Sequence, residues 1–347
     1  MSIKIFDRLV GPKHSPIIIA EMSANHNGSF ENAKNIIFSA KKSGASAVKL
    51  QSYRPDTITI NSNKDDFMIK SGLWKGKSLF DLYESASMPW DWHKPLFDYA
   101  RKINMPLFSS PFDKTAIDML EDVGCPAYKI ASFEAIDLPL ISYAARTGKP
   151  MIISTGMANK TEINEAIEAA QKSGCKNLAI LHCVSGYPAK SSDYNIRTIS
   201  NLITQTKLTV GLSDHTQTNT TAIASIALGA SIIEKHFTMN KNGGGADDSF
   251  SIEPHEFKRL VNDCNEAWNS IGSVNYNLKE TEKDNVQFRR SIYFIKDVSK
   301  GSLITEKDIQ IIRPGNGIAP KFFEEIISKK LNRNVKRGDS VQWEYFE

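Results

Sequence analysis

The sequence lacks three features that would each define a class of protein. It has four cysteines among 347 residues, and no two of them have the CxxC spacing of a zinc finger or a redox motif. No apolar run approaches the roughly 20 residues that a membrane span needs, and the N-terminus has no signal-peptide core. The net charge of +4 is too small to indicate nucleic-acid binding. We therefore expect a cytoplasmic protein with reduced thiols that binds neither nucleic acid nor membrane.

Short apolar runs do occur, and they alternate with amphipathic segments that are typical of helices. Eight of these runs are candidate strands: residues 17–20, 47–50, 106–109, 127–131, 150–154, 178–183, 209–212 and 231–234. Eight strands that alternate with helices predict an α/β fold, a (β/α)8 TIM barrel over about residues 16 to 272.

The sequence pattern changes after residue 272. A polar, charged stretch is followed by turn signals and short alternating runs, which predict strands over 290–296 and 340–345 and a helix over 320–329. We expect a catalytic barrel over 1–272, a linker over 273–288 and a small β-rich domain over 289–347. A domain of fewer than about 80 residues is only marginally stable alone, so it is expected to dock on another surface.

Polar side chains follow the predicted strands. In TIM-barrel enzymes the active site lies at the carboxyl ends of the strands. Two lysines and several hydroxyls around one mouth favour an anionic ligand, because such donors match phosphate and carboxylate oxygens. The strand-end residues are Glu21, Ser23, Asn25, His26, Lys49, Gln51, Ser109, Ser110, Lys129, Ser132, Ser154, Thr155, His182, Ser185, Tyr187, Ser213, His215, Glu234 and His236.

Two histidines follow the last two predicted strands. His215 and His236 each end an apolar run, and a right-handed crossover would place both at the same end of the barrel. With Glu21 and Glu234 nearby, they suit a divalent metal such as Mn²⁺ with open water positions. The spacing leaves metal ligands and structural histidines both open. We expect three further histidines at the surface: His14, His93 and His255.

The connection from residue 52 to residue 89 is unusually long for a barrel loop. It follows the second predicted strand, which places it on the catalytic face. Loops of this length are commonly functional or flexible. Two interpretations are open: a surface excursion pinned by Trp74 and Phe80, or a loop that contacts the substrate.

Seven short motifs occur in order along the strand ends, at residues 19–26, 48–51, 110–113, 128–134, 153–157, 211–215 and 233–237. In combination they resemble the phosphoenolpyruvate-condensing nonulosonate synthases, the sialic acid synthase family. The resemblance covers nearly the whole chain. Residues 289–347 are similar to the antifreeze-like (SAF) domain that ends these enzymes. The resemblance implies a homodimer with swapped C-terminal domains, in which Arg313 reaches into the barrel of the partner subunit.

The resemblance also implies roles for individual residues. The metal ligands would be His215 and His236, for Mn²⁺ or alternatively Mg²⁺ or Co²⁺. Phosphoenolpyruvate would be held by Lys49, Ser110, Lys129, Ser132, Ser154, Ser185 and Ser213, with Ser110 in place of the commoner threonine. The amino-sugar aldehyde would face Gln51, Tyr187, Glu234, Asp247, Phe288 and Arg313. The candidate catalytic residues are Glu21, Lys49, Lys129 and Glu234, with Glu21 in proton transfer.

Segment 73–83 (LWKGKSLFDLY), together with 131–134 and 249–251, resembles one branch of this family. That branch condenses phosphoenolpyruvate with a 2,4-diacetamido-2,4,6-trideoxy sugar. The branches that make N-acetylneuraminate or legionaminate are the alternative. Outside the family, a Schiff-base aldolase would use the amine of Lys129 or Lys235. A carbohydrate-binding protein with a degenerate barrel is the non-enzymatic hypothesis.

Overall fold

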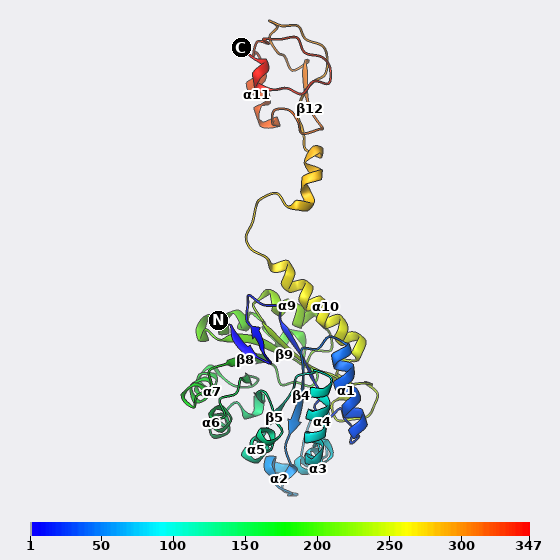
Figure 1. Cartoon of the computed structure of the whole chain (residues 1–347), viewed down its shortest axis with the longest axis vertical. Coiled ribbons are helices and arrows are strands. Elements are labelled where there is room, and N and C mark those ends of the chain that lie inside the picture. Colours follow the sequence, from blue (N-terminus) through cyan, green and yellow to red (C-terminus); the bar gives the residue numbers. More distant parts are fainter. Residues whose placement is uncertain (1) are drawn as a thin grey trace. The chain divides into compact units, whose positions relative to one another are not determined.

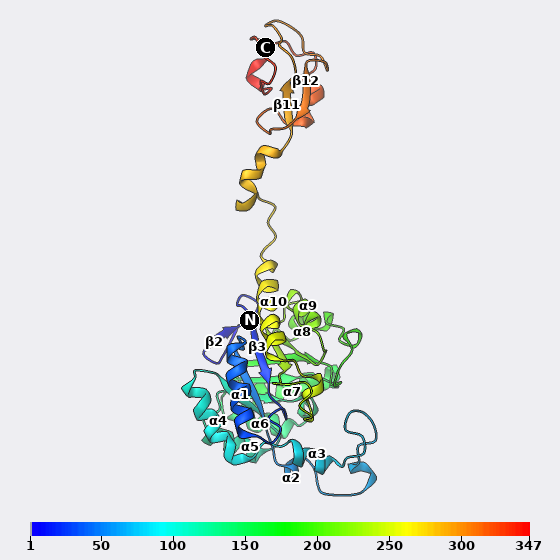
Figure 2. The same ribbon diagram turned by 90° about the vertical axis from the view of Figure 1, so that its right-hand side faces the viewer.

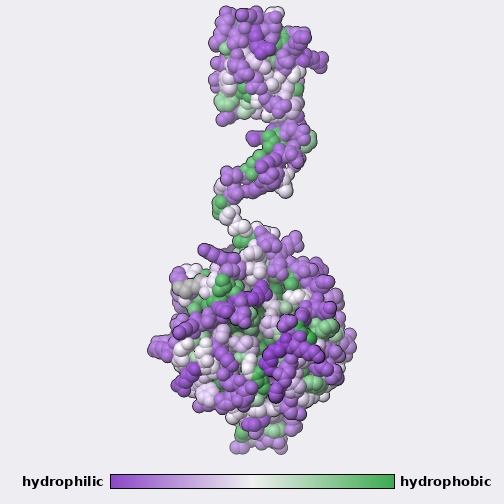
Figure 3. Space-filling model, in the orientation of Figure 1, coloured by the Kyte–Doolittle hydropathy of each residue, from purple (hydrophilic) through white to green (hydrophobic). Residues whose placement is uncertain are grey.

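The computed structural model describes residues 2–347, which form two compact units. One unit ends at Gly272, and the other runs from Ser273 to Glu347. Each unit has its own cluster of buried apolar side chains. Hydrophilic residues dominate the visible surface of both units, and apolar residues occur there only in small patches (Figure 3). Among the described residues, no helix has both the length and the apolar character that a membrane span requires.

Eight parallel strands close the first unit into a barrel, which confirms the predicted fold class (Figure 1). Consecutive strands are neighbours, and the last pairs with the first. Helices cover the outer face of the barrel wall and side chains fill its interior, so both faces are buried and these strands appear in the sequence as continuous apolar runs. The strands are β3 (Ile17–Glu21), β4 (Ala47–Ser52), β5 (Leu107–Pro111), β6 (Tyr128–Ile130), β7 (Met151–Ser154), β8 (Leu178–Cys183), β9 (Thr209–Asp214) and β10 (Ile232–His236).

Helices surround the barrel (Figure 2). Several end just before a glycine with positive φ, which lets the chain reverse into the next strand. The helices are α1 (Phe30–Lys42), α4 (Trp90–Lys102), α5 (Lys114–Asp122), α6 (Leu138–Arg146), α7 (Lys160–Lys172), α8 (Arg197–Thr206), α9 (Thr220–Ala227) and α10 (Pro254–Ile271). An N-terminal hairpin, β1 (Ile3–Ile5) and β2 (Arg8–Val10), is an additional element that the apolar periodicity did not reveal.

The long connection after β4 is folded. It contains α2 (Pro55–Ile58), the 3₁₀-helix η1 (Asp65–Phe67) and α3 (Leu79–Ala86). Helices α2 and α3 lie at one end of the barrel in both views (Figures 1 and 2). We call residues 52–89 the β4 excursion.

His93 corrects the expectation of a surface histidine, since its side chain is fully buried on α4. Its Nε2 lies 2.7 Å from the Ser52 hydroxyl, and Ser52 is 2.7 Å from the Ser109 hydroxyl. Its Nδ1 lies 3.2 Å from the carbonyl oxygen of Trp90. Burial lowers the pKa of His93 to about 4. The sequence pattern failed here because the hydroxyl partner of His93 comes from β4, another element.

The second unit contains one antiparallel pair, β11 (Ser291–Phe294) with β12 (Ile309–Ile312). The predicted final strand at 340–345 is wrong: Ser340 makes only an isolated bridge to Tyr293. The alternation of apolar side chains suggested a strand, but backbone hydrogen bonds turn Trp343–Tyr345 into the 3₁₀-helix η7. The other helical segments are η5 (Glu280–Phe288), η6 (Pro320–Phe322) and α11 (Phe323–Ile326). The helix predicted over 320–329 is therefore shorter than expected.

Acid should destabilise the barrel through His93. In the unfolded chain a histidine titrates near 6.5, whereas the folded pKa is about 4. The unfolded state therefore binds the proton first, and stability is lost as the pH falls from about 6.5 to about 4. The shift corresponds to roughly 3 kcal/mol.

In the variant His93→Gln the amide oxygen can still accept a hydrogen bond from Ser52. Between pH 6.5 and pH 4 this variant should lose roughly 3 kcal/mol less of its free energy of unfolding than the wild type loses. Urea denaturation at several pH values measures the difference. His255→Gln is the control, since the His255 side chain is 78% exposed. Identical pH dependence of His93→Gln and the wild type would contradict the role of His93.

Candidate active site

Four charged side chains meet inside the mouth of the barrel. The Lys49 ammonium lies 3.0 Å from Glu21 Oε2 and 3.5 Å from Glu234 Oε1. Lys129 lies 3.5 Å from the same oxygen of Glu234. All four side chains are at least 94% buried. The strand register brings them together, because Glu21 pairs with Lys49 across β3 and β4 while β10 carries Glu234 on the other side of β3. We call these four residues the charge cluster.

Burial and mutual charge set the protonation of the charge cluster. Burial raises the pKa of Glu21 to about 7, since the attraction of Lys49 offsets only part of the desolvation. Burial also opposes ionisation of Glu234, but the two lysines outweigh it and lower its pKa. Burial lowers the pKa of Lys129, whereas two carboxylates raise that of Lys49 despite its burial. The site therefore holds an ammonium group that stays charged, that of Lys49, and a carboxyl group that can exchange a proton near neutral pH, that of Glu21.

Hydroxyl groups surround the two lysines. Lys49 donates to the Ser110 hydroxyl at 3.1 Å. The Gly156 amide donates to the Ser132 hydroxyl at 3.2 Å, and a side chain at Gly156 would collide with the hydroxyl of Ser185. The hydroxyls of Ser154 and Ser185 are buried and have no hydrogen-bond partner, and Ser213 is buried as well. Free buried hydroxyls beside ammonium groups suit the oxygens of a phosphate or carboxylate.

His215 and His236 lie side by side, with ring centroids 5.4 Å apart. His215 Nδ1 is 2.8 Å from the carbonyl oxygen of Val184, an arrangement that orients the ring and leaves Nε2 available. The pKa of His236 lies well below its usual value, because burial and the charges of His215 and the lysines disfavour protonation. His236 Nδ1 is buried without a partner.

A neutral imidazole beside an oriented one suits a divalent metal. Among residues 2–347, no group of three or more His, Cys, Asp or Glu side chains is arranged to hold an ion. A metal at this position would therefore take its remaining ligands from water or substrate.

A cavity of about 340 Å³ opens beside the charge cluster and the two histidines. Gln51 joins its floor to the charge cluster, donating to Glu21 at 3.0 Å and to Ser23 at 2.8 Å. Ser23 in turn donates to Asp247, whose pKa is raised by burial. The ring of Tyr187 packs against that of His215, with centroids 4.4 Å apart and an interplanar angle of 41°.

The structure thus places the barrel residues expected to hold substrate and metal at or beside this mouth. Two other strand-end residues lie elsewhere: Ser109 pairs with Ser52, and His182 lies against the carbonyl oxygen of Tyr194. Phe288 and Arg313 belong to the second unit, where both are exposed, so their roles stay predictions.

Two residues in the mouth were missed from the sequence. Glu134 lines the cavity, its Oε2 is buried without a partner, and burial raises its pKa to about 7. Cys183 lies 3.9 Å from His215 Nδ1. Burial alone would raise the pKa of this thiol, but His215 lowers it to about 7. Their positions in the sequence could have indicated that they lie at the mouth, because Cys183 ends β8 and Glu134 follows the end of β6 by four residues.

Lys235 has a structural environment. Its ammonium lies 2.6 Å from both Asp214 Oδ2 and the carbonyl oxygen of Thr216, and 3.0 Å from the Thr218 carbonyl. An amine with three acceptors is not free to attack a carbonyl group. This observation disfavours Lys235 as the nucleophile of an aldolase.

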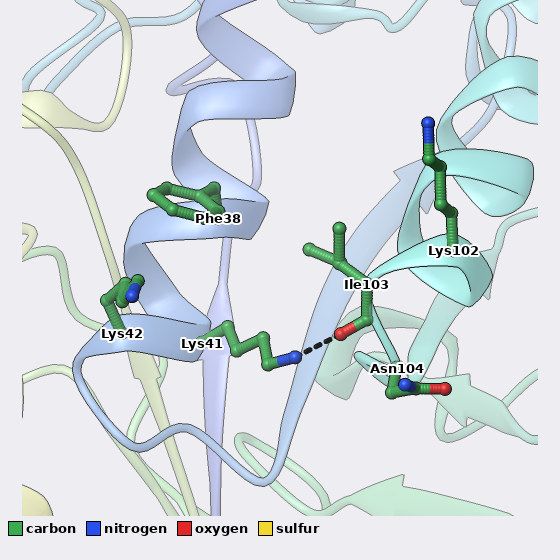
Figure 4. A pocket seen from close by; sticks show the side chains of 6 residues that line it. All are labelled: Phe38, Lys41, Lys42, Lys102, Ile103 and Asn104. Carbon is green, nitrogen blue, oxygen red and sulfur yellow. Dashed lines mark hydrogen bonds between the residues drawn. The ribbon is translucent and has the colours of Figure 1, made fainter.

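A second cavity lies outside the barrel between α1 and the end of α4 (Figure 4). Lys41 of α1 donates to the carbonyl of Ile103. Lys41, Lys42 and Lys102 are exposed there. Solvated surface lysines give no particular chemistry, so the mouth of the barrel is the candidate site.

Comparisons with known proteins agree with this geometry. A model of the NeuB family matches residues 36–276, and one of the SAF domain matches residues 289–347. The chain is 42% identical to the pseudaminic acid synthase of Helicobacter pylori, over 92% of this chain and 95% of that protein. It is 35% identical to the N,N'-diacetyllegionaminic acid synthase of Campylobacter jejuni, over 94% and 98%. The crystal structure of spore coat polysaccharide biosynthesis protein SpsE from Bacillus subtilis superposes with a TM-score of 0.68 at 31% identity, covering 100% and 99%.

Removing one carboxylate of the charge cluster should destabilise the fold. In Glu234→Gln the buried Lys129 ammonium loses its main counter-charge, and breaking such a pair typically costs about 3–5 kcal/mol. Glu31→Gln removes the same charge from a surface ion pair with Lys34 and should cost less than about 1 kcal/mol. Urea denaturation of both variants at one pH measures the contrast. Equal losses would show that the charge cluster is not a coupled unit.

Proposed function

The chain belongs to the NeuB family, and we propose that it acts as a pseudaminic acid synthase. The reaction joins phosphoenolpyruvate to the aldehyde of 2,4-diacetamido-2,4,6-trideoxy-L-altropyranose, takes up water and releases phosphate. The relatives named pseudaminic acid synthase support this choice within the family. The observation that carries the proposal is the buried charge cluster, ringed by hydroxyls and adjacent to two histidines at the mouth of a closed barrel.

The anionic substrate fits the lysine side of the mouth. Lys49 and Lys129 would face its phosphate and carboxylate, and the hydroxyls would take the remaining oxygens: those of Ser110, Ser132, Ser154, Ser185 and Ser213. Preorganised donors of this kind stabilise charge that develops during the reaction without any rearrangement. Ser154 and Ser185 support the assignment, because their buried hydroxyls lack partners within the protein.

The histidine side fits a divalent metal, with Mn²⁺ as the first candidate and Mg²⁺ or Co²⁺ as alternatives. His215 and His236 would hold it, and when bound it would polarise the sugar aldehyde. His236 supports the assignment because its ring is neutral and its buried Nδ1 is unpaired. The Val184 carbonyl holds the His215 ring in one orientation.

Glu21 is our candidate for proton transfer. A carboxyl group with a pKa of about 7 can both accept and donate a proton near neutral pH. It lies within hydrogen-bond reach of Lys49 and Gln51, which hold it at the boundary between the lysine side and the cavity. From there it would handle the proton of the water that adds to C2 or of a sugar hydroxyl. Glu234, ionised between both lysines, would keep their ammonium groups in place.

The amino sugar would occupy the cavity beside Gln51, Tyr187 and Asp247. We further propose a homodimer with swapped C-terminal domains, in which Phe288 and Arg313 complete the sugar site of the partner subunit. Both side chains are exposed within their own unit, which leaves them available for such a contact.

Phosphate release tests the proposed function. With Mn²⁺ present, phosphate should appear only when both phosphoenolpyruvate and a diacetamido-trideoxy sugar are added, and the L-altro isomer should be the best substrate. Candidate diacetamido sugars and N-acetylmannosamine are compared in parallel. Consumption of N-acetylmannosamine alone would refute the assignment. Trapping of pyruvate by borohydride without a metal requirement would indicate an aldolase instead.

His215→Ala should lose metal binding and turnover together, because half of the protein ligands are removed. Mn²⁺ affinity, measured by titration calorimetry, should fall by at least about 100-fold. His255→Ala removes an exposed histidine and should bind Mn²⁺ as the wild type does. If His215→Ala kept the affinity of the wild type, the metal assignment would be wrong.

A further inference from the structure

The cavity at the barrel mouth has two chemically different sides. The barrel contributes all of its charged and amide side chains: Gln51, Glu134, His236 and Asp247. The β4 excursion contributes none. It provides an aliphatic and aromatic surface that consists of Ile58, Ile69, Trp74, Leu79, Leu82, Tyr83 and Ala86, and that we call the apolar wall. Tyr53 of the excursion also lines the cavity, and the barrel unit adds Phe112 and Phe133. A ligand that fills this cavity therefore meets all of the charged and amide groups on the barrel side, and on the excursion side a largely apolar surface that carries the hydroxyls of Tyr53 and Tyr83.

The base of the excursion is fastened where the chain leaves and re-enters the barrel. Ser52, at the start, hydrogen-bonds at 2.7 Å to His93, just past the end. The Arg54 guanidinium lies 4.7 Å from the centre of the Trp90 ring. Tyr53 packs against Tyr83 of the apolar wall, with ring centroids 5.8 Å apart. Three successive residues thus join the two ends of the excursion. These contacts fix the position of the apolar wall relative to the barrel.

The tip of the excursion is fastened on the opposite side of the cavity. Backbone hydrogen bonds between Ile69 and Lys77 (3.0 Å) and between Gly76 and Ile69 (2.9 Å) close a small hairpin around Trp74. The Trp74 indole N–H then donates to the carbonyl oxygen of Ala246 at 3.1 Å. Its ring lies 6.0 Å from that of Tyr187. Because this bond uses the one polar atom of Trp74, only its carbon surface is left for a ligand.

We propose that the apolar wall selects the sugar by packing against its methyl groups, above all the methyl at C6. This inference rests on the proposed function. The trideoxy sugar has a methyl group at C6 and two acetamido methyl groups, whereas N-acetylmannosamine has hydroxyls at C4 and C6. The polar floor can serve the amide and hydroxyl groups of either sugar. The apolar wall has no charged or amide group, so it is the side of the cavity that would favour a methyl group over a hydroxymethyl group.

The expected discrimination is moderate. A hydroxyl placed against the apolar wall would lose its water without gaining a partner. Hydrophobic pockets of this kind reject an added hydroxyl by about a hundredfold in kcat/KM. We therefore expect the wild type to prefer the trideoxy sugar over N-acetylmannosamine by roughly that factor.

A polar substitution in the apolar wall tests the inference. Leu79→Gln places an amide at the half-buried first residue of α3. Leu73→Gln is the matched control, since Leu73 belongs to the same excursion, is 54% exposed and does not line the cavity. The measured quantities are kcat/KM for both sugars, the KM for phosphoenolpyruvate and the melting temperature. Ile69→Thr tests the same wall from the hairpin if Leu79→Gln does not fold.

Leu79→Gln should reduce the ratio of kcat/KM for the trideoxy sugar to kcat/KM for N-acetylmannosamine about tenfold, mainly by raising the KM of the trideoxy sugar. The KM for phosphoenolpyruvate should stay within about twofold, and Leu73→Gln should behave as the wild type. A folded Leu79→Gln and Ile69→Thr that both keep the full preference would overturn the inference, as would equal losses for both sugars. A wild type that does not use the trideoxy sugar would instead refute the proposed function.

Discussion

The burial of two lysines and two glutamates in one barrel mouth is the constraint on which this site depends. A single buried ion costs several kcal/mol, so none of the four could remain charged there without the others. Parallel closure of the barrel supplies the partners, because β3, β4, β6 and β10 all end at the same place. The compensation is uneven: Glu234 lies between both lysines, whereas Glu21 has a pKa of about 7. That imbalance separates a structural counter-ion from a group able to move protons.

The two histidines rest on a second buried ion pair. Asp214 and Lys235 directly precede His215 and His236 on β9 and β10, and their side chains meet at 2.6 Å. The Lys235 ammonium also binds two carbonyls of the chain that follows His215. Alternation along each strand places the histidines in the mouth and this pair behind it. The ends of both strands are thereby tied together.

The β4 excursion extends the site beyond what the strands provide. Barrel strands offer a few side chains each at their carboxyl ends, and here those are nearly all polar. Most of the apolar surface of the cavity comes from a connection, the β4 excursion, and Phe112 and Phe133 add to it from the segments after β5 and β6. The excursion is long enough to hold two short helices and a hairpin, and it is fastened at both base and tip. On the proposed role of the apolar wall, a change in this one connection would combine the same barrel chemistry with a different sugar.

Some features could be predicted from the sequence because they depend on local pattern. Strands buried on both faces appear as apolar runs, and the polar residue that ends each run lies at the mouth of any barrel built from them. Lys49, Lys129, His215 and His236 were found in this way. The same reasoning misplaced His93, because the pattern of an amphipathic helix does not reveal that the Ser52 hydroxyl of β4 is its partner. It also produced a false strand at 340–345.

The sequence by itself determined the barrel, the family and most of the polar residues at its mouth, with Glu134 and Cys183 as the exceptions. Only the tertiary structure decided which charges pair, which carboxyl group has a raised pKa and which residues form the apolar wall. The physical reason is that a pKa depends on burial and on neighbours that are distant along the chain. Glu21 acquires its environment from Lys49 and Glu234, and Trp74 acquires its position from the carbonyl of Ala246. Periodicity and motifs report local conformation, whereas these pairings exist only after the barrel has closed.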